Sequence, residues 1–208
     1  MKIALLCPGP SLPEFWKPAA DFMDYDLIVA VNTASWLYQC DWLCCADRSI
    51  VEGLHVAPRI GYITHDAMRE YLPPSAQLDP LPLRLAACVT CKYPLPPEKP
   101  TDACAFTFPN ALEWSRRRLQ ESGHTNVCLD LFGFDCSPQA LDCAGKEGSH
   151  GLPRWKWELP WIKHAWFPGI KVHSRLPLAV LAWLEDRGSW ADCEAALTGF
   201  HAEADVQQ

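Results

Sequence analysis

Short, predominantly apolar runs that are each followed by a polar residue or a turn constrain the fold of this chain most strongly. Four such runs stand out: 2–6, 26–31, 42–46 and 127–134. Continuous apolar runs of this length are typical of strands that are buried on both faces. Segments with helical spacing lie between or after them: 33–39, 110–122 and 177–186. This alternation predicts an α/β, Rossmann-like fold with a mostly parallel sheet and helices on both faces.

The remaining segments carry weaker patterns. Residues 59–63 and 170–172 are expected as short strands, residues 65–71 as a helix, and residues 155–166 as a partly helical segment broken at Pro160. A Pro-rich stretch from about 74 to 109 predicts an irregular excursion that contains one strand, Leu83 to Val89. Without a visible linker or repeat, we expect one domain over residues 1–200 and a frayed acidic tail over 201–208.

Charge and cysteine content narrow the function classes. The net charge is −7 and the pI is near 5.4, which excludes a general nucleic-acid binder and leaves nucleic acid only as a substrate. No apolar run approaches the ~20 residues of a membrane span. The eleven cysteines are an odd number and lie within apolar segments, so we expect buried free thiols and a cytoplasmic protein.

Polar residues at strand ends predict a binding site, because ligands of open α/β sheets bind outside the carboxyl ends of the strands. These residues are the turn Pro8-Gly9-Pro10-Ser11, then Asn32, Asp47 and Asp135. Gly9 would let the backbone approach a ligand, and Ser11 with the following amides would face a phosphate. Asn32 would pair with a base or ribose edge. A plain tight turn with a helix N-cap is the structural alternative for residues 8–11.

The same segments carry a family resemblance. Residues 2–12, with the turn Pro8-Gly9-Pro10-Ser11-Leu12, resemble the opening strand and Gly-Asn-Gly-Pro-Ser-Leu turn of a Rossmann-like glycosyltransferase group. That group includes the bacterial lipo-oligosaccharide sialyltransferases, hydroxymethylpterin pyrophosphokinase-like proteins and flagellin-glycosylation proteins. Residues 29–32, 42–47 and 110–135 resemble its later strand ends, up to a Gly-x-Asp. Cys7 and Pro8 replace the usual Gly and Asn, which leaves the nucleotide open.

The resemblance implies a metal-independent transfer of a sugar from a nucleotide sugar to a hydroxyl acceptor. Its nucleotide site would comprise Gly9, Pro10, Ser11, Asn32, Asp47 and Asn110. Asp135 would orient hydroxyl groups, and a histidine would act as base, with His150 ahead of His164 and with His173 as a further candidate.

Two alternatives to this transferase stay open. The first is a Mg²⁺-dependent pyrophosphokinase that acts on a small heterocycle and holds the metal through Asp47 and Asp135. The second is a non-catalytic module that binds or sequesters a nucleotide. Neither the acceptor nor the oligomeric state follows from the sequence.

Two further clusters have competing interpretations. Four tryptophans accompany basic residues in one short segment: Trp155, Trp157, Trp161 and Trp166 with Arg154, Lys156, Lys163 and Lys171. Core packing is one interpretation, and a stacking surface for a sugar or base is the other. Cys88 and Cys91 form a C-x-x-C pair without a second pair, so we expect buried thiols rather than a zinc site.

Overall fold

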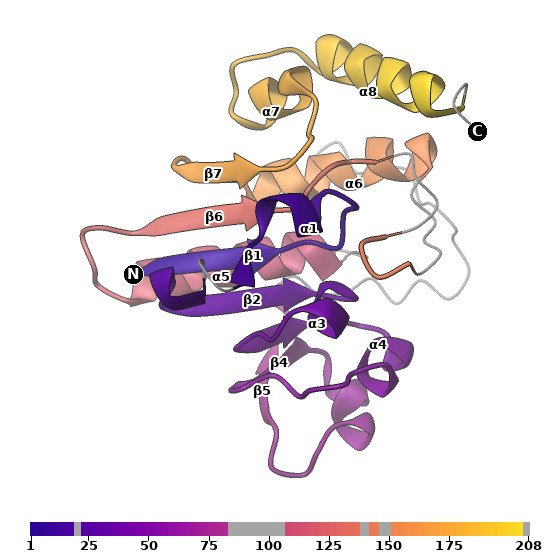
Figure 1. Cartoon of the computed structure of the whole chain (residues 1–208). Coiled ribbons are helices and arrows are strands. Elements are labelled where there is room, and N and C mark those ends of the chain that lie inside the picture. Colours follow the sequence, from indigo (N-terminus) through magenta and orange to yellow (C-terminus); the bar gives the residue numbers. More distant parts are fainter. Residues whose placement is uncertain (19–21, 83–106, 138–141, 146–150, 206–208) are drawn as a thin grey trace.

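The structure is a computed structural model that describes residues 1–18, 22–82, 107–137, 142–145 and 151–205. Its centre is one seven-stranded sheet in the order β5-β4-β3-β2-β1-β6-β7, in which every neighbouring pair is parallel (Figure 1). The strands are β1 Lys2–Leu6, β2 Leu27–Val31, β3 Trp42–Cys44, β4 Gly61–Thr64, β5 Gln77–Pro80, β6 Cys128–Phe132 and β7 Ile170–His173. The predicted α/β, Rossmann-like fold class is confirmed.

Helices cover both faces of this sheet. They are α1 Leu12–Phe15, α3 Ala34–Leu37, α4 Arg48–Glu52, α5 Thr107–Glu121, α6 Leu152–Ala165, α7 Leu178–Leu184 and α8 Trp190–Asp205, with 3₁₀ turns at η1 Phe22–Asp24 and η2 Asp66–Tyr71. One core cluster joins the sheet to α5, α6, α7 and α8, and the second joins it to α1, α3 and α4 (Figure 1). The central strands β1, β2 and β3 are therefore buried on both sides, as the apolar runs predict.

The order of the strands creates a switch point beside β1. The chain moves from β1 to β2 on one side of the sheet, and β6 later pairs with the other side of β1. Connections leaving β1 and β6 therefore diverge, and the space between them lies at the carboxyl edge of the sheet. The loops after β1, β2 and β6 all meet at this edge.

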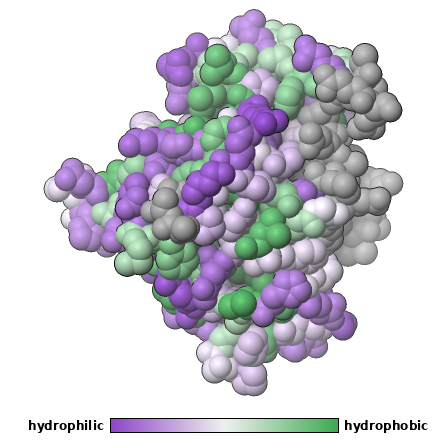
Figure 2. All heavy atoms as spheres, in the orientation of Figure 1, coloured by the Kyte–Doolittle hydropathy of each residue, from purple (hydrophilic) through white to green (hydrophobic). Residues whose placement is uncertain are grey.

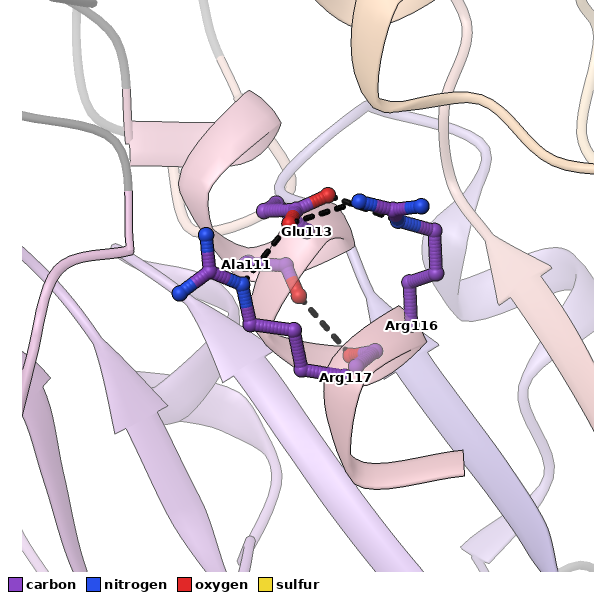
Figure 3. Close-up of polar contacts among 5 residues, drawn as sticks. Ala111, Glu113, Arg116 and Arg117 are labelled. Carbon is purple, nitrogen blue, oxygen red and sulfur yellow. Dashed lines mark hydrogen bonds and ion pairs between the residues drawn. The ribbon is translucent and has the colours of Figure 1, made fainter. Parts of the chain in front are cut away.

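The long helix α5 packs its apolar side on the sheet and buries one carboxylate. Glu113 is 5% exposed and accepts hydrogen bonds from Arg116 at 2.7 and 2.8 Å and from Arg117 at 2.8 Å (Figure 3). On the same helix, the buried Ser115 hydroxyl donates to the carbonyl oxygen of Ala111 at 2.8 Å. These local bonds satisfy polar groups that burial would otherwise leave unpaired.

Several boundaries differ from the sequence prediction. The strand β5 was not predicted, because Gln77–Pro80 is polar and half-exposed at the edge of the sheet. The expected strand at 83–89, Cys88 and Cys91 lie outside the described residues. Helix α6 continues through Pro160, where a break was expected, because its buried side chains, such as Leu159 and Ile162, hold it against the core.

The prediction of a frayed tail over 201–208 is wrong for residues 201–205, which belong to α8. Cys193, Leu197 and His201 follow one another at a spacing of four and are all buried, so they form one packed stripe. His201 Nε2 also lies 3.2 Å from the carbonyl oxygen of Cys136. The acidic residues around this stripe hid the helical pattern.

The surface is mixed in character, and the thiols are free. On the face shown in Figure 2, hydrophobic residues form small separate groups among hydrophilic ones. Among the described residues, no helix combines the length and apolarity that a membrane span requires. The eight cysteines in the described ranges are free thiols: Cys7, Cys40, Cys44, Cys45, Cys128, Cys136, Cys143 and Cys193.

Candidate functional site

A cavity of about 70 Å³ lies at the switch point, beside the carboxyl ends of β1, β2 and β6. Because one buried water needs about 10–15 Å³, the cavity has room for a few water molecules or for a small part of a ligand. Its described lining comprises Cys7, Pro8, Gly9, Pro10, Val31, Asn32, Thr107, Phe108, Gly133, Phe134, Asp135, Cys136, Ser137, Asp142, Arg154, Trp155 and Glu158. Four of the predicted site residues, Gly9, Pro10, Asn32 and Asp135, therefore meet at one place.

The loop after β1 uses all of its main-chain N–H groups inside the protein. Cys7 donates to the carbonyl oxygen of Phe132 and Gly9 to that of Gly133, at 2.9 and 3.0 Å. Leu12 donates to the carbonyl oxygen of Gly9 at 3.0 Å, and the Ser11 N–H donates to Asp135 Oδ2 at 2.8 Å. Pro8 and Pro10 have no N–H to offer. Because every N–H of residues 7–12 is used in this way, the loop presents none to a phosphate. The helix that follows, α1, has only four residues.

Gly9 lies where the β1 loop touches the β6 loop. A Cβ atom on Gly9 would lie 2.1 Å from the carbonyl oxygen of Gly133 and 2.6 Å from Asp135 Oδ2. Gly133 has a φ of +68°, and its own Cβ would lie 2.7 Å from the carbonyl oxygen of Cys7. The two glycines therefore let two backbone segments meet, and the close approach at Gly9 is made to protein atoms.

Asn32 supplies a free acceptor to the cavity. Its φ is +47°, in the left-handed region that asparagine tolerates better than most residues. Its main chain is fixed, since the N–H donates to the carbonyl oxygen of Cys44 and its own carbonyl oxygen accepts the Ser35 hydroxyl. The side-chain Oδ1 is buried and has no hydrogen-bond partner. A buried acceptor without a partner beside a cavity favours a ligand that donates a hydrogen bond.

Asp135 is 3% exposed and is bonded to two loops. Besides the Ser11 N–H, its carboxylate accepts the Ser11 hydroxyl and, at 2.9 Å, the main-chain N–H of Arg175. The carboxylate thus connects the β1, β6 and β7 ends. This is a positioning role within the protein, made at the place where the sequence predicted contact with a ligand.

Aromatic side chains form one wall of the cavity. The rings of Phe108 and Phe134 lie 4.8 Å apart, and Trp155 meets Phe134 edge-on at 6.2 Å. Trp155 Nε1 donates to the carbonyl oxygen of Ser137 at 3.3 Å. Trp157 and Trp161 are buried core residues, as the packing interpretation predicts. Trp155 lines the cavity, and its stacking on a sugar or base stays a prediction. Aromatic surface beside a cavity suits a ring-shaped ligand.

An ion pair on α6 adds the titratable groups. Glu158 is 3% exposed and accepts a hydrogen bond from Arg154 Nε at 3.3 Å. Burial raises the pKa of Glu158 above its ordinary 4.5, and the charge of Arg154 opposes this only in part. A carboxyl with a raised pKa that lines a cavity is a candidate for acid–base work. Glu158 was not predicted as a site residue, although a single carboxylate among Trp157, Leu159 and Trp161 was a usable signal.

Residues 142–145 close another side of the site. Asp142 accepts hydrogen bonds from the hydroxyl of Thr33 and from the main-chain N–H of Ala144, the latter at 2.9 Å. The N–H of Cys143 donates to the carbonyl oxygen of Pro8 at 2.9 Å, which ties this segment to the β1 loop. Asp142 was not predicted, because nothing in its local sequence marks it as a neighbour of Thr33.

Neither of the buried thiols that line the cavity suits a nucleophile. Burial, with smaller contributions from Asp135 and Glu158, raises the pKa of Cys7 and Cys136 well above the ordinary 9.0. Since the thiolate is the reactive form, these side chains act as small apolar groups at neutral pH.

The other predicted site residues lie elsewhere. Asp47 is exposed in front of α4, and Asn110 is fully buried within α5; neither lines the cavity. His164 is exposed near the end of α6 and also lies off the cavity, while His150 lies outside the described residues. His173 stacks on Phe132 with 4.7 Å between the rings, and its buried Nε2 has no partner.

The described residues contain no group of three His, Cys, Asp or Glu side chains placed to hold a metal ion. Asp47 and Asp135, which a Mg²⁺ site would need together, do not share the cavity: Asp135 lines it and is bound to Ser11, whereas Asp47 is exposed and is not part of its lining. Comparison with protein-family models, with curated proteins and with solved structures gave no match to this chain.

Proposed function

We propose that this chain binds the nucleoside end of a nucleotide sugar in the switch-point cavity and transfers the sugar to a hydroxyl acceptor. The observation that carries the proposal is the cavity itself, which is lined by Asn32, a residue whose buried Oδ1 is an acceptor without a partner. The aromatic wall of Phe108, Phe134 and Trp155 supports a flat, ring-shaped group in that space. Donors on a base or ribose would satisfy Asn32.

The remainder of the donor would extend from the cavity past Arg154. This guanidinium is the single cationic side chain among the described lining residues, and it is partly exposed. A cation in this position favours the phosphate that leaves with the nucleotide. The reaction class itself rests only on the resemblance of residues 1–50 and 105–136 to the Rossmann-like glycosyltransferase group.

Glu158 is the base of the proposed transfer. It lines the cavity, it is buried, and burial raises its pKa, so it can accept the proton that the acceptor hydroxyl loses. His164 is exposed and off the cavity, which makes it the weaker candidate among the described residues. The alternative of a non-catalytic binding module is favoured by one observation, the absence of a free N–H in residues 7–12.

Thermal-shift measurements with CMP, UDP, GDP and ATP, with and without Mg²⁺, test binding and metal dependence together. The proposal predicts that one nucleotide raises the melting temperature without Mg²⁺. A shift that requires Mg²⁺ would favour the pyrophosphokinase alternative, and a shift without consumption of the matching nucleotide sugar would favour the binding module.

Activity measurements on variants then test the base. We expect Glu158→Gln to lose about 100-fold or more in turnover, while His164→Ala retains it. Full turnover in Glu158→Gln, or its loss in His164→Ala or His150→Ala, would contradict the assignment of Glu158.

A further inference from the structure

Three hydrogen-bond donors at the switch point converge on one carboxylate of the protein itself. The Ser11 N–H reaches Asp135 Oδ2 at 2.8 Å, while the Ser11 hydroxyl and the Arg175 N–H reach Oδ1, the latter at 2.9 Å. Ser11 and Asp135 are each 3% exposed, so these bonds are made away from solvent. Ser11 follows β1 and Arg175 follows β7, so loops far apart in the sequence supply the donors.

Such convergent donors at the carboxyl edge of a parallel sheet have the chemistry that binds a ligand phosphate in many nucleotide-binding folds. In this chain Asp135 already occupies them. The remaining N–H groups of residues 7–12 donate to carbonyl oxygens, and Pro8 and Pro10 have none. Gly9 lies so close that even a Cβ would contact Asp135 Oδ2. An incoming anion would therefore meet the negative charge of Asp135 and no free N–H group of residues 7–12.

The other charges around the cavity act in the same direction. Its described lining contains three carboxyl groups, Asp135, Asp142 and Glu158, against the guanidinium of Arg154. Arg154 is also paired with Glu158 at 3.3 Å. Like charges in a partly desolvated site repel more strongly than in water. The acceptor oxygen of Asn32, by contrast, favours a group that donates a hydrogen bond.

We propose that Asp135 is an internal anion that determines the orientation and class of the ligand: it keeps phosphate and other anionic groups away from the β1 loop, so the part of the ligand that enters the cavity is a hydrogen-bond-donating ring without negative charge. The identity of that ring as part of a nucleoside rests on the proposed function. Exclusion of anions is a property of the free protein and is tested without a nucleotide.

Asp135→Ala tests the proposal, because it removes the carboxylate and leaves the Ser11 and Arg175 donors free. Inorganic phosphate and sulfate are titrated against the wild type and the variant, with the melting temperature as the readout. At about ten times the dissociation constant, phosphate should raise the melting temperature of Asp135→Ala by about 3–6 °C. The wild type should show no comparable shift.

Asp66→Ala is the matched control, because Asp66 is exposed in η2 and its loss changes the net charge equally. It should respond to phosphate as the wild type does. Ser11→Ala in the Asp135→Ala background removes one donor and should weaken the phosphate effect about tenfold in affinity. Equal phosphate shifts in the wild type, Asp66→Ala and Asp135→Ala would overturn the proposal.

If Asp135→Ala does not fold in plain buffer, refolding from urea with and without phosphate replaces the melting measurement. A yield that rises with phosphate supports the internal anion, and a yield that phosphate leaves unchanged overturns it. Titration of the wild type with uncharged nucleosides is done separately. Failure of every nucleoside to bind would remove the proposed function and leave the anion result standing.

Discussion

Replacing Gly9 by alanine is expected to destabilise the fold strongly. The new Cβ would lie 2.1 Å from the carbonyl oxygen of Gly133 and 2.6 Å from Asp135 Oδ2. To reach ordinary contact, the two loops must separate by about 1 Å, which breaks the 3.0 Å bond from the Gly9 N–H to Gly133. The same movement disturbs the buried bonds between Ser11 and Asp135.

The magnitude follows from these contacts. Overpacking costs about 1–3 kcal/mol, the lost main-chain bond about 1 kcal/mol, and the weakened bonds to a buried carboxylate about 1–2 kcal/mol. The free energy of unfolding should therefore fall by about 3–6 kcal/mol. With a urea m-value of about 2 kcal/mol/M, the midpoint should fall by about 1.5–3 M.

Gly199→Ala is the control for this substitution. Gly199 lies inside α8, and no atom comes within 4 Å of the Cβ position. Because glycine inside a helix costs about 0.5–1 kcal/mol relative to alanine, this variant should be more stable than the wild type. Urea unfolding followed by circular dichroism measures both. If the free energy of unfolding of Gly9→Ala lies within about 0.5 kcal/mol of the wild-type value, the close contact described between the β1 and β6 loops at Gly9 is contradicted.

Two buried carboxylates should respond to pH in opposite directions. Burial alone would raise the pKa of Glu113, but hydrogen bonds and charge from Arg116 and Arg117 outweigh burial and lower the pKa. The ionised Glu113 therefore stabilises the folded state above pH 4.5, and this stabilisation is lost as the pH falls through the lowered pKa. Glu113→Gln should therefore cost about 1 kcal/mol at neutral pH, and a loss that persists in acid would contradict this. The pKa of Glu158 is raised, so the free energy of unfolding should fall as the pH rises from 4.5 through that pKa. In urea unfolding measured across this pH range, Glu158→Gln should show a smaller fall than the wild type. Parallel pH profiles for the two proteins would contradict this.

The framework of the fold was predictable because each central strand is buried on both faces. The uninterrupted runs Lys2–Leu6 and Leu27–Val31 have no amphipathic helical interpretation, and both are strands. Edge elements carry no such signal. The polar edge strand Gln77–Pro80 owes its pairing to β4, and α8 owes its stability to packing on α7 and α6. Local sequence does not record these partners.

The candidate site was predictable only in part, for a physical reason. The rule that ligands bind at strand ends placed Asn32 and Asp135 correctly at one edge, and the structure brings both to one cavity. It could not show that Asp135 bonds to Ser11, a contact between residues 124 positions apart. Nor could it separate Asp47 from that cavity, because the strand order was unknown. Glu158 enters the site only because α6 packs beside the β6 loop.

Titration calorimetry on Asn32→Gly tests the central claim, that the switch-point cavity holds the donor-bearing ring of a nucleotide, most directly. Glycine accepts the φ of +47° without strain, so the variant removes the side chain and keeps the backbone. Asp186→Gly, at a φ of +59° in an exposed turn, is the matched control. The account predicts that the nucleotide found by thermal shift binds Asn32→Gly about tenfold more weakly and binds Asp186→Gly like the wild type. Equal binding to all three proteins would contradict it.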